Sequence, residues 1–271
     1  LIVYALPILY LFFNSEKLSK VLYLSILVNI KPYFGLLIIP DFLKKNYYEV
    51  LIFIFIAASI YILTSMMIGS EFLGFIKNLF LFNENIFSLR ELMSLPSSIL
   101  AHTIFFSHVD ISLLSDNSHI KNLFLSILYF GYILLLFLFF YTVIRFRKKL
   151  CHKELLCLFI ISLTNFFYQI GGYSIILYFI IIPYLYKNYR FLVYLIMPLF
   201  LPLDLVPIFT DILYNQNSYL YGGITDVYYT LGIGSIIRPI LNYLLLFFMC
   251  IFIIQKFTNN NMLYIGKLNE K

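Results

Sequence analysis

The sequence predicts an all-α polytopic membrane protein with about seven complete transmembrane helices and one partial N-terminal helix. Two observations lead to this prediction. Hydrophobic residues make up 62% of the 271 residues and charged residues only 12%, whereas soluble domains are nearer one half and one quarter. The apolar residues also fall in runs of about 20, the length that an α-helix needs to cross a bilayer.

Seven apolar runs qualify as complete or nearly complete spans. They cover residues 18–40, 50–68, 122–144, 154–170, 173–186, 191–209 and 236–254. Residues 1–13 form an apolar run that is short for a span, and no basic segment precedes it as in a signal peptide. We therefore expect this run to be the last part of a helix that begins upstream of Leu1. Residues 1–271 would then be a single, N-terminally incomplete transmembrane domain.

The connections between the spans differ in charge. Two long interruptions, residues 69–117 and 210–234, carry few basic residues, whereas the short connections at residues 41–49, 145–153 and 187–190 and the C-terminal tail are basic. Of the 19 Lys and Arg residues, twelve fall in this basic set of connections. Six, among them Lys20, fall at the other ends of the predicted spans or in the two long interruptions. Because cytoplasmic loops carry an excess of Lys and Arg, we expect the basic set and the C-terminus to be cytoplasmic and the two long loops to face outward.

Lys31 is the most unusual residue of the predicted spans, because it lies near the middle of residues 18–40 beside Pro32. A charge inside a span is costly to bury and usually faces a cavity or a partner. The proline favours a kink, which membrane helices tolerate where a cavity or a neighbour satisfies the backbone. The alternatives are that the side chain extends to an interface or that the true span is shifted along the sequence. We expect Lys31 to be a substrate-binding residue.

Polar side chains at three other places are further substrate-binding candidates. Asn165, Gln169 and Tyr173 surround a glycine pair that breaks a span, and such groups commonly line a cavity. The alternative is hydrogen bonding that only holds the bundle together. Asp204, in a proline-broken span, could pair with Lys31 or cap a half-helix. Arg238 begins the last span, where it could hold a phosphate or anchor the helix end.

The first long loop contains carboxylates and histidines. Asp110 or Asp116 could act as a general base toward a sugar or lipid hydroxyl, and the alternative is a solvated loop with ordinary helix caps. His102 and His108 do not have the spacing of a zinc site, so we expect no metal and no other cofactor. Nucleic acid is not an expected partner, because the basic residues lie between apolar runs, as orientation signals do.

One segment resembles a known family. The residues Asn29-Ile30-Lys31-Pro32-Tyr33, followed by Phe42-Leu43-Lys44-Lys45, resemble a segment of the polyprenyl-phosphate-sugar-dependent, mannosyltransferase-like proteins of the GT-C superfamily of bacterial membrane glycosyltransferases. Residues 162–178 are similar to the later broken span of that family. The loop near Phe87-Ser88-Leu89 has the same relative place as a loop with a Ser-Leu pair there. The resemblance covers residues 18–186 loosely.

The resemblance implies an inverting transfer of a sugar from polyprenyl phosphate to a glycan or glycolipid acceptor at the outer face of a bacterial inner membrane. A carboxylate would deprotonate the acceptor, while Lys31 and Arg238 would offset the charge of the departing phosphate. The catalytic carboxylate of the family lies in the first outward loop, and no Asp of this chain matches it. We therefore expect the base to lie upstream of Leu1, or the chain to be inactive.

Two other classes of membrane protein remain open. A polymerase of O-antigen or capsule repeat units also has many spans and a large outward loop. Basic residues in two outward loops would favour it, but the first contains only Lys77 and Arg90 and the second has none before Arg238. A secondary transporter would use Lys31, Asp204 and the helix break as a site at the membrane midplane, although no inverted repeat is recognisable.

Overall fold

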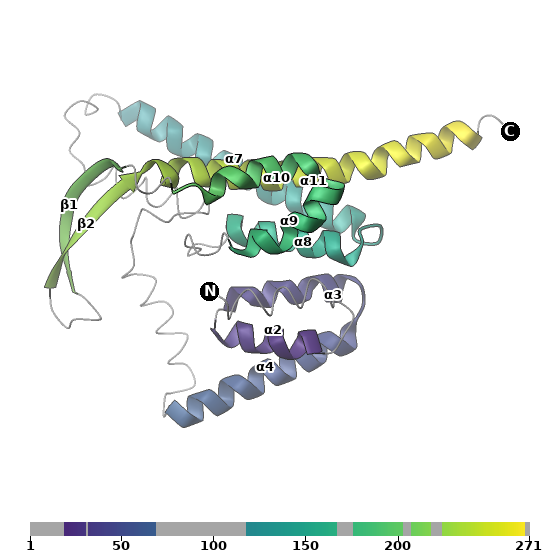
Figure 1. Ribbon diagram of the computed structural model, residues 1–271, viewed down its shortest axis with the longest axis horizontal. Coiled ribbons are helices and arrows are strands. Elements are labelled where there is room, and N and C mark those ends of the chain that lie inside the picture. The colour runs from purple at the N-terminus through teal and green to yellow at the C-terminus, as the bar shows by residue number, and fades with distance from the viewer. Residues whose placement is uncertain are drawn as a thin grey trace.

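The computed structural model describes residues 19–30, 32–68, 118–166, 176–202, 207–217 and 224–268, which form helices and one β-hairpin (Figure 1). Three helices are long and apolar enough to cross a membrane, namely α4 (Tyr47–Ile68), α7 (Ser118–Phe146) and α11 (Ile233–Leu268). The predicted helical, membrane-type architecture is therefore supported. Of the seven predicted spans, these three are found at full length among the described residues.

The predicted span over residues 18–40 is wrong as a single helix. It consists of α2 (Ser19–Ile30) and, running back beside it, η1 (Pro32–Ile38) with α3 (Ile39–Leu43), as Figure 1 shows. A side-chain carbon added to Gly35 would lie 3.6 Å from Val28 Cγ2, so the two arms pack closely. Pro32 has no amide hydrogen and disfavours helical backbone at the preceding residue, which explains why α2 ends there. Residues 19–43 are called the half-length hairpin below.

The predicted span over residues 191–209 is also replaced by shorter elements. The chain forms α10 (Arg190–Ile196) and η4 (Met197–Phe200), and a strand begins at Pro207. Pro198 lies in η4, and Pro202 follows its end. Since each proline removes a backbone donor and clashes with the preceding turn, closely spaced prolines prevent a continuous helix here.

A β-hairpin occupies much of the region predicted as the second outward loop. Strand β1 (Pro207–Asn217) pairs antiparallel with β2 (Ile224–Gly232), with Thr210 opposite Thr230. No strand was expected from the sequence. Figure 1 shows the hairpin at the end of the molecule opposite the C-terminus, where β2 leads directly into α11.

Helix α8 (His152–Phe166) forms the centre of the fold. Every residue from Glu154 to Asn165 is buried, as expected of a helix that has neighbours on all sides. It contacts α9 (Ile176–Asn188), α11 and the second arm of the half-length hairpin. The ring of Phe139 on α7 meets the ring of Phe159 edge to face, with centroids 5.5 Å apart. Helix α8 therefore connects the half-length hairpin to the remaining helices.

Candidate functional site

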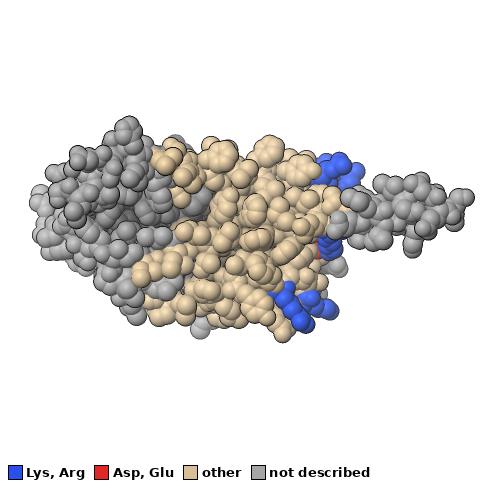
Figure 2. Space-filling model, turned by 90° about the horizontal axis from the view of Figure 1, so that it is seen from above, with Lys and Arg blue, Asp and Glu red and all other residues tan. Residues whose placement is uncertain are grey.

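The basic connections of the chain come together at one end of the molecule. Figure 2 shows Lys and Arg side chains gathered at one end of the described surface, while the remainder of the described surface in this view carries no Lys or Arg. The Lys44 ammonium donates a hydrogen bond to the carbonyl of Leu150, which joins two of these connections. This region, called the basic end below, includes Lys44, Lys45, Arg145, Arg147, Lys148, Lys149, Lys153, Lys187, Arg190 and Lys256.

An ion-pair cluster closes the base of the half-length hairpin at this end. Lys20 Nζ lies 2.6 Å from Asp41 Oδ1 and 2.5 Å from Glu49 Oε2, and the side chains of Lys20 and Asp41 are only 2% and 4% exposed. Asn46 Nδ2 donates a further hydrogen bond to Asp41 at 3.3 Å. The expected separation of Lys20 from the connection at residues 41–49 is wrong, because residues 32–43 run back beside α2 and bring Asp41 and Glu49 to Lys20.

Asp41 also joins the hairpin to the central helix. His152, the first residue of α8, has its Nε2 3.1 Å from Asp41 Oδ1. Burial raises the pKa of the Asp41 carboxyl, but the hydrogen bonds and positive charges of His152 and Lys20 outweigh it and hold the pKa below its ordinary value. The carboxylate is therefore ionised at neutral pH and fixes two neighbouring elements.

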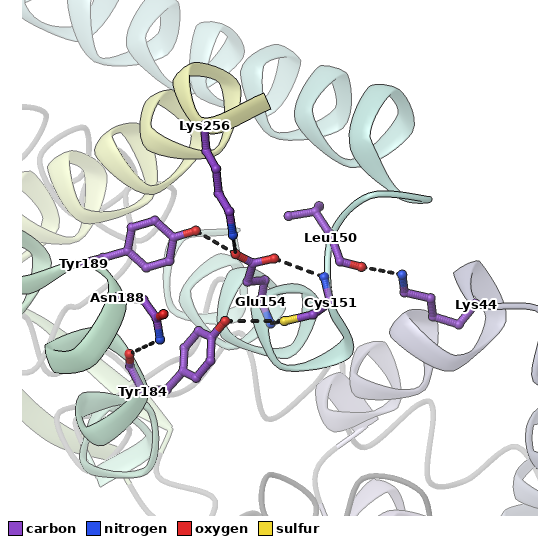
Figure 3. A network of polar contacts seen from close by, with 8 residues as sticks. All are labelled: Lys44, Leu150, Cys151, Glu154, Tyr184, Asn188, Tyr189 and Lys256. Carbon is purple, nitrogen blue, oxygen red and sulfur yellow. Dashed lines mark hydrogen bonds and ion pairs between the residues drawn. The ribbon is translucent and has the colours of Figure 1, made fainter. Parts of the chain in front are cut away.

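Glu154 is the second buried carboxylate at the basic end. Figure 3 shows three donors converging on it from different elements: Lys256 Nζ at 2.5 Å, the Tyr189 hydroxyl at 2.7 Å and the Cys151 amide at 3.0 Å. Burial raises the pKa of Tyr189 above its ordinary value, and the Glu154 carboxylate raises it further, so the phenol remains a donor. Tyr184 extends this network with its hydroxyl 3.3 Å from Cys151 Sγ.

Helix α2 runs parallel to α4, and polar side chains fix their relative height. Ser25 Oγ donates to the Phe53 carbonyl at 3.3 Å, and Asn29 Nδ2 donates to the Ala57 carbonyl at 3.1 Å, with partners 28 residues apart in both pairs. Ala57 is the middle residue of the apolar stretch of α4, Tyr47–Met67. The first arm of the half-length hairpin therefore ends level with the middle of a helix that is long enough to cross a membrane.

Asn165, a predicted substrate-binding residue, belongs to a buried network between α8, α9 and α11. Its Nδ2 donates to the carbonyls of Ile161 and Asn242 at 2.9 Å and 3.0 Å. Asn242 Oδ1 accepts from the Tyr178 hydroxyl at 2.6 Å, and that hydroxyl lies 2.5 Å from Thr164 Oγ1. Both amide hydrogens of Asn165 are thus used inside the bundle, which favours the interpretation that it holds helices together.

Arg238, the other described candidate, is 4% exposed near the start of α11. Its Nη2 donates to the Leu201 carbonyl at 3.1 Å, directly after the end of η4. Of the two roles expected for Arg238, this contact favours the structural one, because it holds the α10–η4 segment against α11.

The remaining predicted site residues lie outside the described residues. These are Lys31, Gln169, Tyr173, Asp204, Asp110 and Asp116. The predicted outward loop over residues 69–117 lies outside as well. In the part of the chain that the structure describes, no group of three His, Cys, Asp or Glu side chains is placed to hold a metal ion.

Sequence reasoning did not select Lys20, Asp41, His152 or Glu154. Charge counting treats acidic residues in basic connections as solvated, and these carboxylates lie among many lysines and arginines. One local feature of the sequence pointed to burial of these carboxylates. Asp41 and Glu154 each border an apolar run, where a side chain is easily buried. Their partners are far away in the sequence, and only the fold identifies them.

Comparison with known proteins finds no matching family model, no matching curated protein and no matching solved structure. The function is therefore argued from the residues and contacts of this chain.

Proposed function

We propose that the protein is a membrane glycosyltransferase that transfers a sugar from a polyprenyl-phosphate donor to a glycan or glycolipid acceptor on the outer face of a bacterial inner membrane. The observation that carries this proposal is the half-length hairpin, whose first arm ends at Ile30, level with the middle of α4. The sequence places Lys31 and Pro32 directly after that end.

The length of the hairpin supports a site within the bilayer. Helix α2 has 12 residues and rises about 18 Å, whereas the hydrocarbon core is about 30 Å thick. A helix break at that depth is tolerated only where protein surrounds the backbone or a water-filled cavity meets it. The basic end of the bundle is filled by the packed ion pairs of Lys20 and Glu154, so we expect no path to the break from that side. A cavity at the break would therefore open toward the opposite, outer side.

The chemistry of the transfer needs a cation near the leaving group. The acceptor oxygen forms a bond to the anomeric carbon, the bond from that carbon to the phosphate oxygen breaks, and the acceptor proton passes to a carboxylate base. The polyprenyl phosphate leaves with increased negative charge, which a preorganised lysine stabilises. Lys31 is the proposed cation, and the GT-C resemblance around Lys31-Pro32-Tyr33 supports this role.

The proposed orientation follows from the charges. The basic end lies on the cytoplasmic side, because Lys and Arg are enriched in cytoplasmic connections. Helix α11 passes through the basic end at Lys256, so the chain after it is proposed to be cytoplasmic as well. Figure 1 shows the β-hairpin at the opposite end of the molecule, which is the outer end in this proposed orientation.

A glycan assay in the host tests the proposal. Lys31→Ala is expected to abolish extension of a cell-surface glycan while the protein still inserts at its normal level. Lys148→Ala, which removes an exposed charge of the basic end, is the matched control and should leave the glycan unchanged. Normal glycan in the Lys31→Ala strain would refute the assigned role of Lys31.

A secondary transporter is the second candidate, because a broken helix near the midplane is also the usual place of a transporter substrate site. The same strains separate the two functions. Solute uptake that is lost in the Lys31→Ala strain, together with normal glycan, would favour the transporter.

A further inference from the structure

A cleft at the basic end has the features of a binding site for phosphate-bearing lipid headgroups. It has a volume of about 460 Å³ and lies between the junction of α9 with α10 and the later part of α11. Its polar lining consists of Asn188, Arg190, Gln255 and Lys256, and Tyr189, Phe191 and Phe252 supply aromatic surface. This volume falls in the range of small-molecule sites, about 300 to 1,000 Å³.

The charge of the cleft favours an anion. Arg190 and Lys256 are both exposed, and no acidic residue is among the lining side chains. Lys256 is paired with the buried Glu154 at 2.5 Å, yet 46% of its side chain remains exposed. The Arg190 guanidinium lies 5.2 Å from the ring centroid of Tyr186, and a guanidinium has a planar edge with two N–H donors side by side. Such an edge matches two phosphate oxygens at once.

The position of the cleft indicates a lipid as the source of the phosphate. Gln255 and Lys256 lie near the end of the apolar stretch Ile237–Thr258, at the level where a spanning helix meets lipid headgroups. The rings of Phe191 and Phe252 meet edge to face with centroids 6.1 Å apart, so an apolar wall adjoins the polar one. A basic pocket between helices with this combination suits an anionic headgroup together with the start of its acyl chains.

We propose that this cleft binds the phosphate of an anionic phospholipid, with Arg190 as the principal ligand and Lys256 as the second cation. The site is separate from the proposed transferase site, which concerns the opposite end of the half-length hairpin. Inorganic phosphate carries the same chemistry without the acyl chains, so the test must distinguish the two sources.

Lipid binding to the purified protein in detergent tests the proposal, with short-chain phosphatidylglycerol as the probe and phosphatidylcholine of equal chain length as the comparison. Phosphatidylglycerol should bind more tightly and raise Tm. Arg190→Gln should weaken its binding roughly fivefold, since one cation near an anionic lipid contributes about 1 kcal/mol. Arg147→Gln removes an equal charge from an exposed position outside the cleft and should change binding by less than about twofold.

Three results would overturn the assignment. If Arg190→Gln and Arg147→Gln weaken phosphatidylglycerol binding equally, the lipid is attracted by the charge of the whole basic end and the cleft is not a specific site. Equal binding of both lipids, which share the phosphate diester and differ in net charge, would exclude selection of an anionic headgroup. Displacement of the lipid by millimolar inorganic phosphate would make free phosphate the ligand. If Arg190→Gln does not fold, Gln255→Glu replaces it, because a carboxylate in the cleft should weaken binding as much.

Discussion

Asp41 and Glu154 are both buried carboxylates at the basic end, but their partners differ. Asp41 is held by Lys20, which is itself 2% exposed, and by His152. Glu154 is held by Lys256, which is 46% exposed, and by two neutral donors. Asp41 joins the half-length hairpin to α8, and Glu154 joins α8 to α11 and to the α9–α10 junction.

Asp41 and Glu154 are buried to a similar degree, but we expect them to depend differently on their counter-ions. A buried charge that loses its partner costs several kcal/mol, because neither water nor another donor replaces the lost interaction. Lys20 is buried and is the shared counter-ion of two carboxylates, Asp41 and Glu49. Lys256, in contrast, is accessible to water. If Lys256 were removed, Glu154 would still accept hydrogen bonds from the Tyr189 hydroxyl and the Cys151 amide.

The largest expected effect is that of Lys20→Met. This change leaves Asp41 and Glu49 close together without their shared cation, and we expect it to lower the free energy of unfolding by about 3 to 5 kcal/mol. Denaturant unfolding of the protein in detergent micelles measures this. Lys45→Met, at an exposed residue of the same connection, is the control and should have little effect. A loss below about 1 kcal/mol for Lys20→Met would contradict the ion-pair geometry.

The second effect is acid destabilisation through Asp41. Its pKa is lower in the folded protein than the ordinary value of 3.8, so its contribution to stability is fully present above that value. That contribution is lost as the pH falls through the lowered pKa. Unfolding measured from neutral pH downward should therefore show a loss that begins at about pH 4 and deepens below it.

Two variants check the assignment of this acid loss. Asp41→Asn should be less stable at neutral pH and should show a smaller loss on acidification. His152→Gln removes a group that lowers the pKa of Asp41, so the folded pKa moves closer to its ordinary value and the acid loss should be smaller and should end at a higher pH. An acid profile that is unchanged in both variants would assign the effect to other carboxylates.

The smallest effect is expected for Lys256→Met. Because nearly half of the Lys256 side chain is exposed, water and salt screen its pair with Glu154, and we expect a loss of only about 0.5 to 1 kcal/mol. The same unfolding assay measures it, and added salt should reduce the difference from the unaltered protein. If Lys256→Met proves as damaging as Lys20→Met, exposure is not what separates the two carboxylates.

Local features of the sequence predicted part of this structure. Apolar length identified α4, α7 and α11, and the clustering of basic residues identified connections that the contacts of Lys44 and Asp41 bring to one end. Pro32 was recognised as a place where helical backbone is disturbed. A kink and a reversal have the same local signature, however, and what separates them is the pairing of Lys20 with Asp41, 21 residues away.

The candidate site was less predictable for the same reason. Asn165 and Arg238 were selected as polar residues in apolar surroundings, and the structure places their side chains on backbone carbonyls of neighbouring elements. Whether an amide faces a cavity or another helix depends on contacts such as the one to Asn242, 77 residues away, which no local pattern encodes. The β-hairpin was missed because the region was interpreted from its polarity alone.

The closed base of the half-length hairpin sets an order for the synthesis of the protein. Lys20 is made first, while the two carboxylates that neutralise it, Asp41 and Glu49, follow later in the chain. Asp41 belongs to the hairpin itself and neutralises Lys20 there, whereas Glu49 belongs to the first turn of α4 and adds the second carboxylate only when that helix follows. The complete ion-pair cluster, and the hydrogen bonds of Ser25 and Asn29 to α4, can therefore form only after α4 has been synthesised.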